Sequence, residues 1–193
     1  ISGFFAITGG GGKASFNDGL PMFESAAMAG IFKESLTNYV ASGGKSPIVT
    51  PDMYTINSAM DGRQYIYSLQ LGLGYKITDW ISVFAGGRMN YFSGNYEGYL
   101  NAKLKQNLGG SELMALALDC DQTGWGLTPV LGVDVKYGKF NFGAKYEFMT
   151  NLNIENNTKK LDYPDSAESL VGAYKHGVNT PNDIPSMLSV AAS

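Results

Sequence analysis

The segment from Arg63 to Ile77 alternates between two kinds of side chain along its length. From Tyr65 onward its odd positions are aromatic or aliphatic, and its even positions are polar or small apart from Ile66. A period of two predicts a β-strand with one apolar face. The segment exceeds the ~5–6 residues of a usual soluble strand and covers the ~9–11 residues that cross a bilayer. It favours a membrane-spanning strand, with a soluble all-β protein as the alternative.

The same alternation predicts further strands over residues 1–9, 81–96, 121–137 and 140–148, and another beginning near Ile184. Very short turns at 78–80 and 138–139 contrast with long loops predicted at 10–62, 98–120 and 152–183. Such long loops are rare inside compact soluble domains. Outer-membrane barrels combine short periplasmic turns with long extracellular loops, and carry aromatic girdles at both interfaces. Aromatic residues flank the short turns here, namely Tyr75, Trp80, Tyr137 and Phe140.

Composition agrees with a barrel and argues against several other classes of protein. Charged residues make up 16% of the chain, against about 25% in typical soluble domains. No apolar run reaches the ~18 residues of a transmembrane helix. The net charge of −3 provides no basic surface for nucleic acid. One cysteine (Cys120) and one histidine (His176) permit neither an internal disulfide nor a histidine-based metal cluster, so we expect no metal and no cofactor.

Motifs that resemble catalytic signatures are incomplete. The glycine run ending at Lys13 imitates a phosphate-binding loop but lacks the first motif glycine and the Ser or Thr after the lysine. Cys120 lies between Asp119 and Asp121, whose charges disfavour a thiolate nucleophile. We therefore expect that the protein is not an enzyme.

Three segments together resemble the FadL-like family of outer-membrane transport proteins, which includes fatty-acid and aromatic-hydrocarbon transporters. They are GLGYKITDWISVFAGGRMNYFSGNYEGYL, GWGLTPVLGVDVKYGKFNFGAKYEF and HGVNTPNDIPSMLSVAAS. The resemblance lies in strand and turn texture over most of the chain. It implies an antiparallel, fourteen-stranded transmembrane β-barrel plugged by an N-terminal hatch. We expect an all-β fold in which residues 1–193 form one partial barrel domain, with about six strands, a helix in an extracellular loop, and the hatch and remaining strands absent.

The resemblance implies a protein of the cell outer membrane that spans it several times. The expected function is a channel for passive uptake of hydrophobic small molecules such as fatty acids. The alternative is a non-transporting FadL-like barrel that acts as a structural subunit of an outer-membrane protein complex. Expected partners are a hydrophobic small molecule, lipid or detergent, the outer membrane, and outer-membrane proteins.

One helix is predicted inside the first long loop, beginning near Pro21 and ending before Gly43 and Gly44. Its apolar residues recur four apart at Met28, Phe32, Leu36 and Val40. A second apolar patch follows Ser111. A groove between the two would suit an acyl chain; alternatively, the helix simply packs over the barrel mouth. The predicted groove residues are Phe23, Met28, Ile31, Phe32, Leu36, Leu113, Met114 and Leu116.

The polar face of the strands predicts a lumen lined by Gln70, Arg88 and Lys145. Arg88 or Lys145 could receive a ligand carboxylate through a charge-assisted hydrogen bond, or pair with Asp134, Glu147 or the plug. Glycines recur on the same face and indicate either a closely packed hatch or an easing of sheet coiling. They are Gly72, Gly74, Gly86, Gly132 and Gly143. Pro129 predicts either a kink with a lateral gap or one locally satisfied irregularity.

Overall fold

The computed structural model describes residues 1–193, apart from the side chains of Ser166, Ser169 and Leu170. Most of the chain forms one antiparallel sheet in the order β1-β2-β3-β4-β5-β8, with β6 paired to β4 and β7 paired to β6. The strands are β1 (Ser2–Phe16), β2 (Tyr54–Lys76), β3 (Ile81–Leu104), β4 (Glu112–Tyr137), β5 (Phe140–Glu147), β6 (Asn153–Asp162), β7 (Asn179–Pro181) and β8 (Met187–Ala192). The helices are α1 (Pro21–Ala41), α2 (Glu168–Val171), and the 3-10 turns η1 (Pro51–Met53), η2 (Gln106–Leu108), η3 (Asp165–Ala167) and η4 (Gly172–Tyr174).

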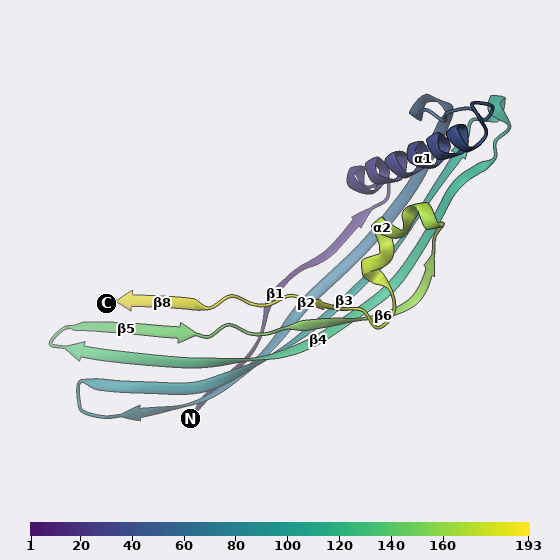
Figure 1. The fold of residues 1–193 in the computed structure, drawn as a ribbon. Helices are drawn as coiled ribbons and strands as arrows, with labels where there is room; N and C mark the ends of the chain where they lie inside the picture. The colour runs from purple at the N-terminus through teal and green to yellow at the C-terminus, as the bar shows by residue number, and fades with distance from the viewer.

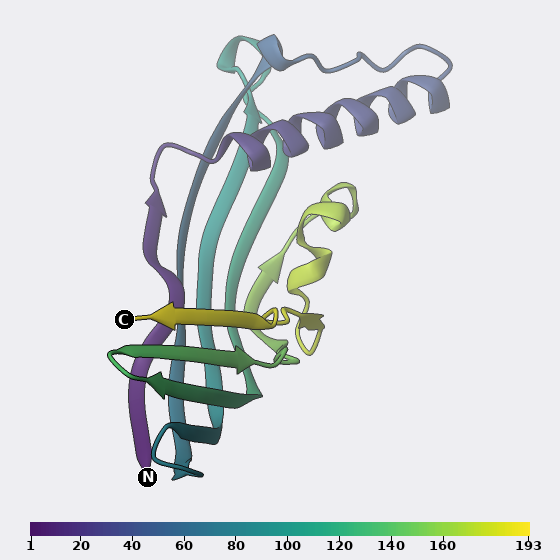
Figure 2. The ribbon, with the colours of Figure 1, turned by 90° about the vertical axis from the view of Figure 1, so that its left-hand side faces the viewer.

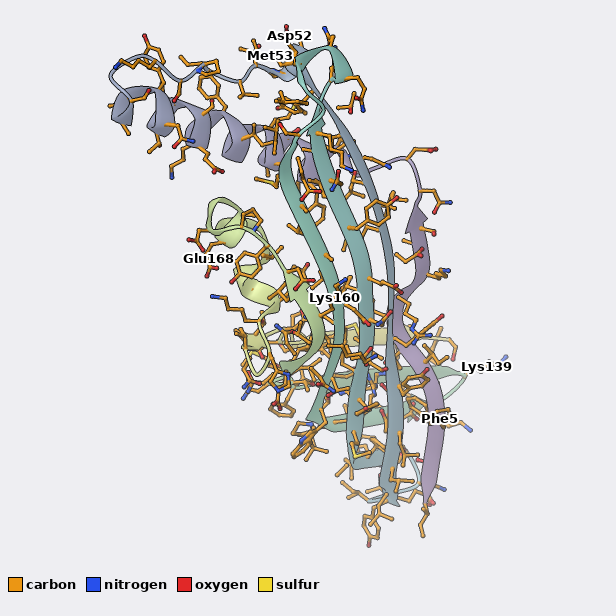
Figure 3. All side chains as sticks on the ribbon, turned by 90° about the vertical axis from the view of Figure 1, so that its right-hand side faces the viewer. Phe5, Asp52, Met53, Lys139, Lys160 and Glu168 are labelled. Atoms are coloured by element: carbon orange, nitrogen blue, oxygen red, sulfur yellow. The ribbon has the colours of Figure 1, made fainter. Side chains whose placement is uncertain are left out.

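The two short turns and the long helix lie at opposite ends of the molecule (Figure 1). At the hairpin end, Thr78 Oγ1 accepts hydrogen bonds from the backbone N–H groups of Trp80 and Ile81 and closes the β2–β3 turn. Gly138 closes the β4–β5 turn with a φ of 60°, which glycine adopts without strain. At the helix end lie α1 and the η1 turn; Figure 3 labels Asp52 and Met53 there and Lys139 in the half that contains the hairpins. Both predicted turns are confirmed.

The sheet is strongly twisted. In Figure 2, β1, β2 and β3 run from top to bottom while β5 and β8 run across the picture. α1 crosses the strands near the helix end, and its C-terminal half extends past them. Long antiparallel strands twist and coil because of the chirality of the backbone, and this brings side chains of distant strands together on one face.

The strands extend further toward the helix end than the sequence pattern indicates. The loop predicted over 98–120 is wrong, because β3 continues to Leu104 and β4 begins at Glu112. Likewise β1 reaches Phe16 and β2 begins at Tyr54, which shortens the loop predicted over 10–62. In this half the apolar positions change sides of the sheet: Leu100 and Met114 are buried under helices. A strand boundary predicted from outward-facing apolar side chains therefore falls short of the true end of the strand.

β6 is a strand that the sequence pattern missed, inside the loop predicted over 152–183. Its sequence is rich in Asn and Lys, which have low β-propensity. Pairing with β4 from Trp125 to Ala117 supplies the hydrogen bonds that local propensity does not favour. Tertiary context thus decides its structure.

The sheet has two faces of opposite character. We call inner face the one on which α1 packs, formed by even-numbered residues of β2, β3 and β4; the outer face carries their odd-numbered residues. β2 and β3 pair without a register shift from Tyr54 to Lys76, so even-numbered residues lie on the inner face along the whole of β2. In the half near the hairpins the inner face buries polar side chains, whereas the outer face exposes large apolar ones. No helix among the described residues is long and apolar enough to cross a membrane.

Candidate ligand-binding site

α1 packs its middle turns against the inner face of the sheet. Pro21 occupies the first turn, where its missing N–H costs nothing, and Gly43 and Gly44 follow the helix with positive φ. The helix buries Ala27, Ile31 and Ser35, which lie four residues apart. Their partners are apolar residues of three strands and of the segment around α2, namely Tyr54, Leu100, Ala102, Met114, Leu116, Ala167 and Val171. The predicted helix boundaries are confirmed.

The predicted contact face of the helix is partly wrong. Phe32, Leu36 and Val40 are 46%, 41% and 70% exposed, so the Met28–Phe32–Leu36–Val40 stripe is not the buried one. The C-terminal half of α1 extends past the strands, where it has no sheet to cover it (Figure 2). Phe32 and Leu36 therefore do not line a groove against the sheet.

The other predicted groove residues come together. Ile31, Met114 and Leu116 are buried in one cluster, and Phe23, Met28 and Leu113 pack against it. The helix and the 113–116 segment thus meet, as the sequence indicates. The segment belongs to strand β4 rather than to a loop.

A narrow apolar cavity of about 30 Å³ remains between the first turn of α1 and the inner face. Its lining residues include Phe23 from α1, Leu116 from β4 and Val171 from α2. Leu20, Ser58, Met60, Leu100 and Leu118 are among the other residues that line it. The cavity is only about the size of a water molecule, and its almost entirely apolar walls offer water few hydrogen-bond partners.

A wider, open hollow of about 410 Å³ adjoins this cavity and shares Leu20, Phe23 and Met60 with it. Its polar groups include Gln64, Tyr96 and Tyr174. The Tyr96 hydroxyl donates a hydrogen bond of 2.8 Å to Gln64 Oε1, and the two tyrosine rings meet edge to face at 6.0 Å. Burial raises the pKa of both tyrosines, so both phenols stay neutral at physiological pH. The hollow therefore combines apolar walls with neutral polar groups and one cationic residue, Arg63.

Cys120 lies on the inner face near these tyrosines and is fully buried. Burial is the main cause that raises the pKa of its thiol, and Asp121 and Asp119 raise it further. A hydrogen bond from Thr158 to the sulfur acts in the opposite direction. The thiol is therefore protonated and inert, as the flanking aspartates predict.

About midway between the hairpin end and the helix end, a layer of polar side chains crosses the inner face. Ser68 donates to Asn90 Oδ1 at 2.6 Å, and Asn90 Nδ2 donates to Thr128 at 2.8 Å. Thr8 and Thr150 extend the chain at its two ends. Ser68, Asn90, Thr128 and Thr150 are at most 3% exposed. A buried polar layer is stable because each group finds a partner.

Arg88 lies in the neighbouring layer toward the hairpins and is held from several sides. Its guanidinium donates to both carboxylate oxygens of Glu147 at 2.7 and 2.8 Å, and to Gln70 Oε1 at 2.9 and 3.1 Å. Lys145 also binds Glu147 at 2.7 Å, and the ring of Phe4 lies 5.6 Å from the guanidinium carbon. The structure thus brings Gln70, Arg88 and Lys145 together. Arg88 pairs with Glu147, one of the alternatives that the sequence left open.

On the hairpin side of the Arg88 layer, the inner face opens into a second hollow of about 410 Å³, which is lined partly by Gly74, Gly132 and Gly143. The Phe84 ring explains two of the other glycines. A Cβ on Gly72 would lie 2.2 Å from Phe84 Cζ. One on Gly86 would lie 2.5 Å from the backbone oxygen of Leu71 and 2.9 Å from Phe84 Cζ. Gly72 therefore makes room for an aromatic ring of its own sheet, and Gly86 allows both that ring and the backbone of β2 to approach closely.

Sequence reasoning missed several members of the site. Tyr174 and Val171 come from the η3–α2–η4 segment, whose local sequence carries no signal that it returns to the sheet. Tyr96 offered one signal, since it occupies an even position of β3 and must face inward with Arg88 and Asn90. No family model, curated protein or solved structure matches the chain, so the FadL-like resemblance stays a prediction.

Proposed function

We propose that the chain is an arc of an outer-membrane β-barrel of the FadL-like kind, with its short turns periplasmic and its helix end extracellular. The support is the reversed polarity of the sheet half near the hairpins. Large apolar side chains cover its outer face, including Phe5 at 68%, Leu71 at 58% and Leu73 at 63% exposure. An apolar surface that extends over six strands is far larger than soluble monomers tolerate. Lipid would cover it.

Aromatic residues bound this apolar surface at both of its ends. Tyr67, Tyr91 and Trp125 are direct neighbours across β2, β3 and β4. Tyr75 and Tyr137 lie near the hairpin turns. The ten steps from Tyr67 to Ile77 span about 33 Å along the strand, or about 25 Å if the strand tilts by ~40°, the height of a barrel's apolar band.

Beyond the Tyr67–Tyr91–Trp125 row the outer face becomes polar. Asp121 lies on the outer face of β4 and binds Lys159 of β6 at 2.7 Å. This hydrogen bond, together with one from Asn95, lowers the pKa of Asp121. Charged side chains at this height suit an extracellular surface above the membrane.

For function, we propose passive uptake of hydrophobic small molecules such as fatty acids. The observation that carries this proposal is the apolar cavity under α1 together with the open hollow beside it. An apolar molecule would enter past Tyr96 and replace solvent against Leu20, Phe23 and Met60. Transfer of its apolar surface from water supplies about 25 cal/mol per Å². Movement down a concentration gradient then needs no further source of energy.

Phe23→Ser is expected to weaken uptake of a radiolabelled long-chain fatty acid about ten- to a hundredfold, because the cavity loses an aromatic wall worth roughly 1.5–3 kcal/mol. Phe32→Ser, on the same helix but outside the cavity, serves as the matched control and leaves uptake unchanged. Uptake is measured in cells that carry the full-length protein, after heat-modifiable gel migration has verified folding. Equal uptake by the two folded variants would contradict the proposed site.

A structural subunit of an outer-membrane complex is the second candidate, and one observation favours it. Phe32, Leu36 and Val40 of α1 are 46%, 41% and 70% exposed, and they lie outside the hydrophobic clusters found in the described part of the chain. If these residues bind a neighbouring outer-membrane protein, Phe32→Ser would abolish stable co-purification of that protein. Uptake would then be insensitive to Phe23→Ser.

A further inference from the structure

Two walls of the ligand-binding site come from a segment that does not belong to the sheet. We call residues 165–178 the return segment; it follows β6 and contains η3, α2 and η4. It contributes Val171 to the apolar cavity and Tyr174 to the open hollow. In Figure 2 it lies beside β6 and below α1. Its helices have only three or four residues each, too few to be stable by themselves, so contacts with the sheet have to hold them in place.

The residue that makes most of these contacts is Asn156 of β6, which is only 1% exposed. Its side-chain Nδ2 donates hydrogen bonds to the backbone oxygens of Ala173 at 2.6 Å and Lys175 at 3.3 Å. Its backbone N–H donates to the oxygen of Val178 at 3.1 Å, and its own carbonyl accepts from the N–H of Gly177 at 2.8 Å. Side chain and backbone of one residue thus bind the return segment at four points.

The orientation of the Asn156 amide is fixed from the opposite side. Asn156 is the cross-strand partner of Gln122 on β4, and Gln122 Nε2 donates to Asn156 Oδ1 at 2.7 Å. This contact leaves Nδ2, which carries both donor hydrogens, for the backbone carbonyls of the return segment, which can only accept. A reversed amide would direct its oxygen at two carbonyl oxygens and leave buried polar groups without partners.

The bonded carbonyls flank Tyr174 in the chain, so the Asn156 amide fixes the backbone on both sides of this tyrosine. The Thr158 hydroxyl, two residues further along β6, contacts the carbonyl of Tyr174 itself. The Tyr174 ring then meets Tyr96 edge to face at 6.0 Å, and Val171 is fully buried in the cluster under α1. The position of both wall residues therefore depends on how β6 holds the return segment.

We propose that Asn156 is the positioning residue of the ligand-binding site, because it holds Tyr174 and Val171 where they form two of its walls. The proposal rests on the uptake function proposed above. Asn156 is not among the residues that line the apolar cavity or the hollow, so its effect on a ligand passes through the return segment. A displaced segment would leave the apolar surface of the ligand in contact with water.

The test measures the Kd of radiolabelled palmitate for the purified full-length protein in detergent, after heat-modifiable gel migration has verified folding. Asn156→Asp keeps the size of the side chain but directs a carboxylate at two carbonyl oxygens. We expect it to raise the Kd about tenfold, the effect of losing the hydrogen bonds that hold the segment. Asn90→Asp is the matched control: Asn90 is also 1% exposed and hydrogen-bonded through both amide atoms, but it contacts no part of the return segment. Its Kd is expected to stay within about twofold of the unmodified protein.

A double-mutant cycle separates positioning from a general loss of stability. Tyr174→Ala removes one wall and is expected to raise the Kd about tenfold by itself. If Asn156 acts through this wall, the double variant Asn156→Asp/Tyr174→Ala binds palmitate about as weakly as Asn156→Asp alone. Independent effects would multiply to a loss of about a hundredfold. A hundredfold loss would overturn the proposal, as would an unchanged Kd in folded Asn156→Asp.

Gln122→Glu decides the question if Asn156→Asp does not fold. Gln122 is only partly buried, and a carboxylate there attracts Nδ2 of Asn156 and so reverses the amide. We expect a Kd about threefold higher, and an unchanged Kd would contradict the positioning role.

Failure of the uptake function would give a different result. If Phe23→Ser weakens binding and Asn156→Asp does not, the uptake function stands and only the positioning role is wrong. If the unmodified protein binds no palmitate, both the uptake function and the role of Asn156 toward a ligand are wrong. Backbone hydrogen exchange then tests the anchoring separately: it rises in residues 165–178 of Asn156→Asp if the amide holds the segment, and stays unchanged if it does not.

Discussion

Replacing Glu147 with leucine is expected to destabilise the folded protein by about 3–5 kcal/mol, because Arg88 would remain buried without a counter-ion. The Arg88 and Glu147 side chains are only 13% and 7% exposed, and their guanidinium and carboxylate form two hydrogen bonds. Gln70 and the Phe4 ring still contact Arg88 in such a variant, but neither carries a negative charge. The loss is measured as a change in the free energy of unfolding by guanidinium, for the full-length protein in detergent.

The double variant Arg88→Met/Glu147→Leu separates the penalty of an unpaired charge from that of general disruption. Removing both charges leaves an apolar pair of similar volume, which is often neutral relative to a buried ion pair. We expect the double variant to recover most of the stability that Glu147→Leu loses. A loss below about 1 kcal/mol for Glu147→Leu, the range of an exposed pair, would contradict a sealed ion pair at this position.

Leu71→Arg is expected to cost about 2–4 kcal/mol, the effect of a cation near the middle of a barrel's lipid-facing band. Leu71 is 58% exposed on the outer face and lies near the midpoint between Tyr67 and Ile77. In a water-soluble protein the same substitution at so exposed a position would change stability by no more than about 0.5 kcal/mol. The measurement is equilibrium unfolding of the full-length protein folded into lipid vesicles.

Asn57→Arg provides the matched control for this prediction. Asn57 is exposed on the same face of the same strand, but it lies beyond the Tyr67–Tyr91–Trp125 row. A cation there stays in water, and we expect a change within about 0.5 kcal/mol. Equal stability losses in the two arginine variants would argue that no lipid covers Leu71.

The sequence predicts the half near the hairpins well because two physical signals coincide there. Outward side chains are large and apolar from Leu69 to Ile77, and inward ones are polar or small, so each strand shows a clean period of two. The turns after Ile77 and Tyr137 are too short for any arrangement other than a hairpin. Side-chain direction follows from parity alone, which places Gln70, Arg88 and Lys145 on one face.

The half at the helix end is predicted less well, because its polarity is reversed. Leu100 and Met114 face inward under α1, while outward positions such as Asn101 are polar. The register is unchanged, but an apolar face now indicates helix packing instead of lipid contact. Which turns of α1 touch the sheet depends on where the helix lies relative to the strand ends. Local sequence therefore could not exclude Phe32 and Leu36 from the site.

The candidate site combines residues that lie far apart in the sequence. Tyr96 of β3 meets Tyr174 of η4, and Thr128 of β4 meets Thr150 beyond β5. Both contacts depend on the coiling of the sheet and on the pairing of β6 with β4. Low β-propensity hid β6, so the sequence could not place Tyr174 beside Tyr96, although Pro129 had already marked an irregularity in β4.

Lipid contact of the outer face is tested most directly by attaching a fluorophore to neighbouring positions of β2. Leu73→Cys places it on the outer face, and Gly74→Cys on the inner face, where an added Cβ meets only Val83 O at 3.9 Å. Each variant carries Cys120→Ala and is folded into vesicles whose acyl chains bear a spin-label quencher. We predict strong quenching at position 73 and little at position 74. Equal quenching at the two positions, or none at 73, would contradict a membrane-spanning wall.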